Sequence, residues 1–203
     1  MYPDNLAEYA AATKASDWKQ IAVINRCAVD SWGTKKEFAV LPKYLDEGEI
    51  VLALASGILS QTGTSNSSDS GSNTWLVVLT NERFLFLDHA LLTSSVDTQS
   101  VRHDRVQAVS ASQGWVLGKI IVDLSARVIT IDNCQKKDVA VMAEIANKIL
   151  REREIKGASA ASAPASIQVD FADQIAKLAA LKQSGVLTDD EFAEAKRKIL
   201  ALI

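Results

Sequence analysis

A series of short apolar segments separated by turn residues, from 49 to 132, constrains the fold of this chain more than any other feature. Near its middle, Phe84 and Phe86 fall on one face of the expected strand, and Leu85 and Leu87 fall on the other. Further runs of this kind lie at 75–80, 106–109, 119–124 and 127–131. Short strands joined by small turns predict an antiparallel sheet that curls into a sandwich or barrel.

The period of the apolar residues changes at 132–133. Beyond it, apolar side chains recur every three or four positions, at Val139, Met142, Ile145, Ala146, Ile149 and Leu150. This spacing predicts one amphipathic helix that packs on the sheet. Residues 1–39 show helical spacing as well, so the expected class is α+β with a helical segment ahead of the sheet.

Two segments have almost no charge and no large apolar side chain that could form a core. Residues 61–73, QTGTSNSSDSGSN, interrupt two apolar runs and predict a long mobile loop within the domain. Residues 157–166, GASAASAPAS, contain only small residues and proline, which predicts a flexible tether. The expected organisation is therefore a helical segment, a sheet domain, a linker and a C-terminal segment at 1–39, 40–156, 157–168 and 169–203.

The sheet region resembles the bacterial pleckstrin-homology-like (PH-like) domains. The resemblance covers about 115 residues and is carried by Tyr44-Leu45, Glu47-Gly48-Glu49, the hairpin 79–86, the segment 106–110 and the closing helix. It implies a barrel or sandwich of about seven antiparallel strands with a C-terminal capping helix.

The C-terminal segment resembles the SHOCT (short C-terminal) domain, a helical hairpin. Its pattern includes Gly185, suited to a helix C-terminus, and a capping box formed by Thr188 and Glu191. A hairpin of this size buries too little surface to be stable alone, so we expect it to associate with another copy or with a different protein. The expected contact residues are Ile175, Leu178, Leu181, Phe192 and Leu200.

The distribution of charge argues against two classes of ligand. The phosphoinositide-binding PH domains of eukaryotes hold phosphates with basic residues on the first two strands, but no Lys or Arg lies between Lys43 and Arg83. Residues 40–156 contain 12 basic and 14 acidic residues, in a chain with a net charge of −3. A basic stripe for nucleic acid is therefore not expected either.

No pattern of catalytic or metal-ligating residues emerges. His89 and His103 are 14 positions apart with no Cys nearby, so we expect two surface histidines and no zinc site. Cys27 and Cys134 do not lie in the sequence context of a nucleophile and are expected to be small buried thiols. We therefore expect no catalytic residue, no metal and no cofactor.

One aromatic residue stands apart from the expected core. The segment 113–118 places Trp115 and Leu117 in a turn, where an exposed aromatic side chain marks a contact surface. These two residues complete the set of predicted interaction residues.

We therefore expect a non-enzymatic scaffold that binds a protein partner and forms homo-oligomers. An alternative is a module that associates peripherally with membranes through Trp115, Leu117 and Lys119. An enzyme of unknown type is the third possibility. The first 18 residues lack the basic start and apolar stretch of a secretory signal, no apolar run is long enough to span a membrane, and the chain has only two cysteines, so a cytoplasmic location is expected.

Overall fold

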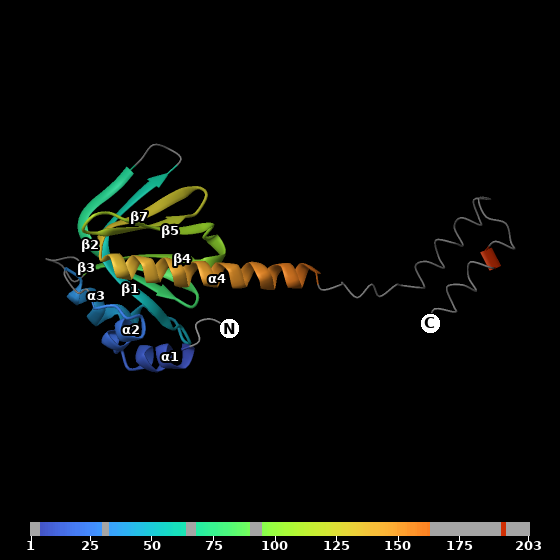
Figure 1. Ribbon diagram of the computed structural model, residues 1–203, viewed down its shortest axis with the longest axis horizontal. Helices are drawn as coiled ribbons and strands as arrows, with labels where there is room; N and C mark the ends of the chain where they lie inside the picture. The colour runs from blue at the N-terminus through green and yellow to red at the C-terminus, as the bar shows by residue number, and fades with distance from the viewer. Residues whose placement is uncertain (1–4, 30–32, 64–67, 90–94, 163–191, 194–203) are drawn as a thin grey trace. The chain divides into compact units, whose positions relative to one another are not determined.

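The computed structural model of the 203-residue chain describes residues 5–29, 33–63, 68–89, 95–162 and 192–193 (Figure 1). The chain divides into two compact units, Met1–Glu154 and Ile155–Ile203. The first unit contains the whole sheet. Its N-terminal helices are α1 (Leu6–Lys14), α2 (Trp18–Ile24), α3 (Lys35–Val40) and the short 3₁₀ helix η1 (Leu41–Lys43). The remaining elements are β1 (Val51–Gly63), β2 (Ser68–Thr80), β3 (Arg83–His89), β4 (Val96–Arg102), the 3₁₀ helix η2 (His103–Arg105), β5 (Ala108–Gln113), β6 (Gly118–Asp123), β7 (Arg127–Cys134) and α4 (Lys136–Ser162).

The strands form one seven-stranded antiparallel sheet in the order β4-β3-β2-β1-β7-β6-β5. The 13-residue strand β1 pairs with β2 along its length and with β7 from Ile58 to Gly63, so it belongs to both halves of the sheet. Strands β4 and β5 are the two edges. This sheet with its C-terminal helix confirms the predicted α+β fold.

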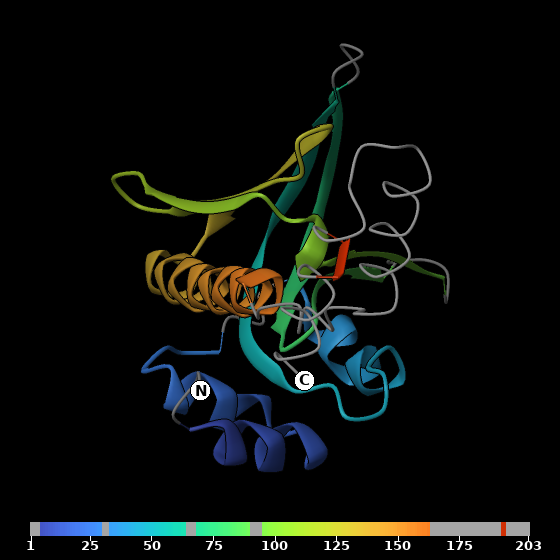
Figure 2. The same cartoon turned by 90° about the vertical axis from the view of Figure 1, so that its right-hand side faces the viewer.

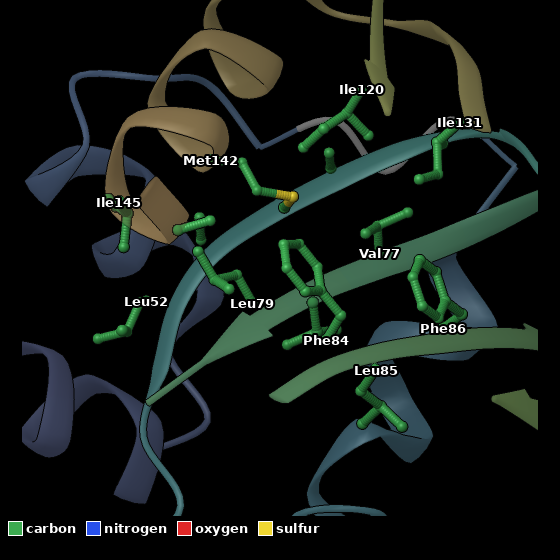
Figure 3. Packing of buried hydrophobic residues seen from close by; sticks show 14 of the residues in the cluster. Leu52, Val77, Leu79, Phe84, Leu85, Phe86, Ile120, Ile131, Met142 and Ile145 are labelled. Atoms are coloured by element: carbon green, nitrogen blue, oxygen red, sulfur yellow. The ribbon is translucent and has the colours of Figure 1, made fainter. Parts of the chain in front are cut away.

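The main core lies between the sheet and α4. Phe84 and Phe86 of β3 point to the same side of the strand as Val77, toward Met142 of α4, and all four are fully buried (Figure 3). Burial of such side chains contributes about 1.5–3 kcal/mol each to stability. The 3–4 spacing of apolar residues on α4 thus provides the face that closes the core.

The N-terminal helices cover the other side of β1–β3. Leu85 points away from Phe84 and Phe86, toward the helices drawn in blue (Figure 3). Helix α3 contacts β2 and β3, and α1 and α2 contact β1. Ile21 and Leu41 are fully buried in the same apolar cluster as the strands. The predicted helical segment is therefore part of the folded body, and both faces of β3 are buried.

The structure differs from the sequence-based prediction in the segment 61–73. A loop was expected there, but β1 continues to Gly63 and β2 begins at Ser68, with Gln61 opposite Asp69. Pairing with β7 explains the difference, because backbone hydrogen bonds hold strands whose own side chains carry no apolar pattern.

Helix α4 also extends beyond its expected end. It runs to Ser162, so residues 157–162 of the predicted linker are helical. Alanine is the strongest helix former, which favours continuation through this Ala-rich stretch. The rest of the predicted linker, 163–168, lies outside the described residues. Across the part of the chain that the structure describes, no helix is long and apolar enough to span a membrane.

Candidate docking surface

Exposed apolar side chains gather at the turn between β5 and β6. Trp115 is 95% exposed, Val116 74% and Leu117 42%. They are three of the five exposed large hydrophobic residues in the described part of the chain, and they are consecutive. A contiguous exposed apolar patch on an otherwise well-packed domain marks a contact surface. We call these three residues the hairpin tip.

Local sequence explains how the hairpin tip is formed and positioned. The backbone N–H of Gly114 donates to the carbonyl of Leu117 at 2.9 Å, which closes a short loop after β5. At Gly118 a Cβ atom would lie 2.6 Å from Val139 Cγ2 and 3.3 Å from Lys136 Cα. Only glycine therefore lets β6 start this close to the first turn of α4. Figure 2 shows the yellow-green hairpin of β5 and β6 extending away from the sheet.

Two lysines lie at the base of the hairpin tip. Lys136 donates a hydrogen bond from Nζ to the carbonyl of Trp115. Lys119 pairs with Asp132 at 2.9 Å, and the hydrogen bond from Lys119 lowers the pKa of that carboxyl. The apolar tip is thus backed by basic side chains, of which one is neutralised by an acid.

The structure places the predicted interaction residues as follows. Trp115 and Leu117 lie in the expected turn and are exposed. Val116 was missed, although its position between the two in a short loop could have revealed it. Phe192 is partly buried. Ile175, Leu178, Leu181 and Leu200 lie outside the described residues. The role of all these residues in binding stays a prediction.

The prediction of two surface histidines is wrong for His103, which is 2% exposed. Its Nε2 lies 2.9 Å from the Thr80 carbonyl oxygen, and the ring meets Phe84 edge-on with centroids 5.8 Å apart. Since a carbonyl only accepts, Nε2 carries the proton of the neutral ring. The error arose because η2 looks polar in sequence, while its contacts with the β2–β3 hairpin are distant along the chain.

Burial lowers the pKa of His103 to about 4, against the opposing effect of its hydrogen bond to the Thr80 carbonyl. The ring is therefore neutral at physiological pH, and Nδ1 has no hydrogen-bond partner among the described residues. Its surroundings are an aromatic ring and a backbone carbonyl. His103 is therefore a core residue. Within the described ranges, no group of three His, Cys, Asp or Glu residues lies close enough together to hold a metal ion.

Cys27 and Cys134, both within the described residues, form no disulfide with each other. Burial, the charge of Asp138 and a hydrogen bond to it raise the pKa of Cys27 to about 11, and Cys134 is fully buried. A thiol is nucleophilic only as the thiolate, so neither environment activates its cysteine.

Comparison with known proteins gives two family matches. The model of the bacterial PH domain matches residues 45–148, and that of the short C-terminal domain matches residues 173–200. Both are non-catalytic domains, and no catalytic family was found. No curated protein matches the chain.

Solved structures of PH domains are similar to part of the chain. The PH domain of USP37 shares 11% identity with a TM-score of 0.38, over 49% of this chain and 97% of that one. The N-terminal PH domain of Vps36 shares 16% identity with a TM-score of 0.42, over 55% of this chain and 86% of that one.

Proposed function

This chain belongs to the bacterial PH domain family and carries a short C-terminal domain, and on that premise we propose that it is a non-enzymatic docking protein. The hairpin tip makes the contact, and the C-terminal domain associates with protein, either another copy or a recruited partner. The observation that carries the proposal is the 95% exposure of Trp115 within a consecutive apolar patch. Indole rings are seldom left in water on a well-packed domain without a partner.

The two parts complement each other energetically. A patch of three side chains buries far less area than a stable protein interface does, so it supports only weak binding. If the C-terminal domains hold copies together, several hairpin tips engage at once, and the second contact becomes intramolecular. Cys27 and Cys134 are not joined by a disulfide, which agrees with a reducing compartment, and we propose the cytoplasm.

A fluorescent label beside the hairpin tip tests the contact in the full chain. In the variant Gln113→Cys, the new exposed thiol reacts with a nitrobenzoxadiazole reagent, while burial of Cys134 and the high pKa of Cys27 protect the native thiols. Ala126→Cys, in the exposed turn at the opposite end of β6, is the matched control. Bacterial lysate is divided into membrane and soluble fractions, and each is added to both labelled chains.

We expect the emission at position 113 to shift to shorter wavelength with one of the fractions, since docking transfers the fluorophore to a less polar environment. The label at position 126 should stay unchanged. If neither fraction shifts the emission at position 113 more than at position 126, the hairpin tip is not a docking surface.

Subunit number tests the role of the C-terminal domain. Light scattering after size exclusion gives the mass of the full chain and of the double variant Leu178→Asp, Leu200→Asp. These substitutions place charges at two positions of the apolar pattern, so we expect a fall in subunit number. Gln174→Asp adds a charge outside that pattern and should leave the subunit number as it is. Equal masses in all three chains would contradict self-association through this domain.

A further inference from the structure

A cavity of about 550 Å³ lies among the N-terminal helices. Figure 1 shows these helices, drawn in blue, gathered beside the sheet. The described lining comes from the turn between α1 and α2, the start of α2, Val29 and helix α3. Small-molecule sites in proteins have volumes of roughly 300–1,000 Å³, so the cavity is large enough for a ligand of modest size. None of its lining residues belongs to the hairpin tip.

Part of the lining is apolar and is continuous with the core. Phe38 of α3 is 9% exposed and belongs to the core cluster, and Trp18 and Val29 are partly buried and pack against it. The indole N–H of Trp18 donates to the carbonyl of Phe38 at 3.1 Å, which joins α2 to α3. Because this polar group already has its partner, these side chains offer a ligand apolar contact rather than hydrogen bonds.

The charged residues of the described lining leave an excess of positive charge. Lys19 and Lys35 are exposed, and within the part of the chain that the structure describes neither forms an ion pair. The acid among these lining residues is Asp17, the N-cap of α2, whose Oδ1 accepts from the Gln20 N–H at 3.0 Å. Two lysines against one aspartate give this lining a net charge of +1.

Apolar side chains beside two unpaired cations are complementary to a ligand that has both properties. We propose that the cavity binds a small amphipathic anion, in which a carboxylate or a similar acid is attached to an aromatic or alkyl body. The body covers Trp18 and Phe38, and the acid faces Lys19 and Lys35. Burial of the body contributes affinity, and the ammonium groups select the anion over a neutral molecule of the same size. This site is independent of the hairpin tip and does not rest on the function proposed for it.

A fluorescent probe with this chemistry tests the inference in the full chain. Anilinonaphthalenesulfonate has an aromatic body and one sulfonate, and its emission rises when apolar surroundings replace water. We expect the dye to bind and octanoate to displace it. Octanol has the same alkyl body without the charge and should bind about fivefold more weakly than octanoate, and octylammonium should bind more weakly still.

Two variants change the lining without replacing a buried residue. Lys35→Glu reverses one cation and should weaken binding of the dye about fivefold or more. Ala15→Phe places a large side chain in the lining, so it should weaken binding by occupying part of the cavity. The matched controls are Lys43→Glu in η1 and Ala11→Phe in α1, both at exposed positions outside the lining, and they should bind the dye like the wild-type chain.

The same site should also be visible in thermal unfolding. A ligand that binds only the folded chain raises the Tm, so octanoate should raise the Tm of the wild-type chain and of both controls, and raise it less for Lys35→Glu and Ala15→Phe. Each variant is compared with its own Tm without octanoate, which separates a lost ligand site from a change in stability.

Several results would overturn the inference. If octanol displaces the dye as well as octanoate does, the lysines select no anion. If Lys35→Glu and Ala15→Phe bind the dye as tightly as the wild-type chain, or if the chain binds no dye, the cavity is not the site. Trp115→Ala should bind the dye normally, and a loss of binding there would place the dye at the hairpin tip instead. None of these results affects the proposed function, which the label at position 113 tests separately.

Discussion

The guanidinium of Arg83 binds both carboxylate oxygens of Glu49, with Nε 2.9 Å from Oε1 and Nη2 2.8 Å from Oε2. The carboxylate is buried and also accepts from the Thr80 hydroxyl at 2.7 Å and the Asp46 N–H at 2.8 Å. Arg83 Nη2 donates further to the Tyr44 carbonyl at 2.9 Å. This network joins the segment ahead of β1 to the β2–β3 hairpin. The residues that carry the family resemblance here are thus determinants of the fold.

Loss of Arg83 should be costly, because it leaves a buried carboxylate without its counter-ion. Burial alone raises the pKa of Glu49, but the bonds from Arg83, the Asp46 N–H and Thr80 outweigh it and lower the pKa. We expect Arg83→Ala to reduce the free energy of unfolding by about 3 kcal/mol or more in urea titrations at pH 7. Arg83→Lys keeps the charge but not the two-point contact and should cost less.

Arg102→Ala is the matched control for Arg83→Ala. Arg102 is exposed and lies 3.7 Å from the exposed carboxylate of Asp104, a surface pair of the kind that contributes little. Its loss should change the free energy of unfolding by less than about 0.5 kcal/mol. Equal effects of the two substitutions would show that the Glu49 network does not hold the hairpin.

His103 should make the fold sensitive to mild acid. Burial lowers its pKa from 6.5 to about 4; Arg153 acts in the same direction, and the Thr80 carbonyl, Asp104 and Glu49 oppose it. Because the folded pKa lies below the unfolded one, the stability contribution is complete above pH 6.5 and is lost as the pH falls toward 4. The free energy of unfolding should fall by about 2 kcal/mol between pH 7 and pH 5 from this residue alone.

The variant His103→Gln isolates this effect. Its amide can donate to the Thr80 carbonyl but does not titrate, so we expect a lower stability at pH 7 and a much flatter dependence between pH 7 and pH 5. His89→Asn removes the other histidine, in β3, and should retain the steep dependence that His103 causes. Equal slopes for the wild-type chain and His103→Gln would contradict the assignment.

Most of the fold could be predicted because its strands alternate and its last helix has a clear period. The clearest cases are the opposite faces of Phe84 and Leu85 and the apolar stripe of α4. Strand β4 gave no such signal, since Val101 is its only buried residue. The strand ends at 61–63 and 68–73 were missed because their pairing rests on backbone hydrogen bonds rather than on side chains.

The candidate site could be predicted only in part, because exposure depends on what surrounds a residue in three dimensions. Trp115 was found through the turn residues Gly114 and Gly118 beside it. The contact of Lys136 with the hairpin tip could not be found, since Lys136 follows β7 and reaches the Trp115 carbonyl only through the pairing of β6 with β7. The burial of His103 could not be predicted for the same reason, because it depends on contacts with Thr80 and Phe84, which are distant in the sequence.

The N-terminal helices should be essential to the stability of the sheet domain. Ile21 is fully buried in the shared core, so Ile21→Ala should cost about 2–5 kcal/mol. Val23, in the same helix α2, is 62% exposed, and Val23→Ala should cost less than about 0.5 kcal/mol. Urea unfolding followed by circular dichroism should show one transition for the first unit, because the helices and the sheet share one core. A separate early transition, or equal effects of the two substitutions, would mean that the helices fold independently.

Gly57 should tolerate no side chain, because it lies where β7 joins β1. A Cβ atom there would be 2.5 Å from the Asp132 carbonyl oxygen, 2.5 Å from Cys134 Sγ and 2.7 Å from Ile131 Cγ2. The carbonyl belongs to the backbone of β7 and cannot move without disturbing the β1–β7 pairing, which begins at Ile58 opposite Asp132. We expect Gly57→Ala to reduce the free energy of unfolding by about 2–3 kcal/mol and to speed hydrogen exchange at the β7 amides.

Gly114→Ala serves as the control for Gly57→Ala, since it makes the same exchange where space is available. There the nearest atom to a new Cβ is the Leu117 carbonyl oxygen at 3.1 Å, in an exposed loop that can adjust. Its cost should stay below about 1 kcal/mol, with unchanged exchange in β7. If both alanine variants lose the same stability, or if exchange in β7 is the same as in the wild-type chain, close approach at Gly57 does not limit how the two halves of the sheet join.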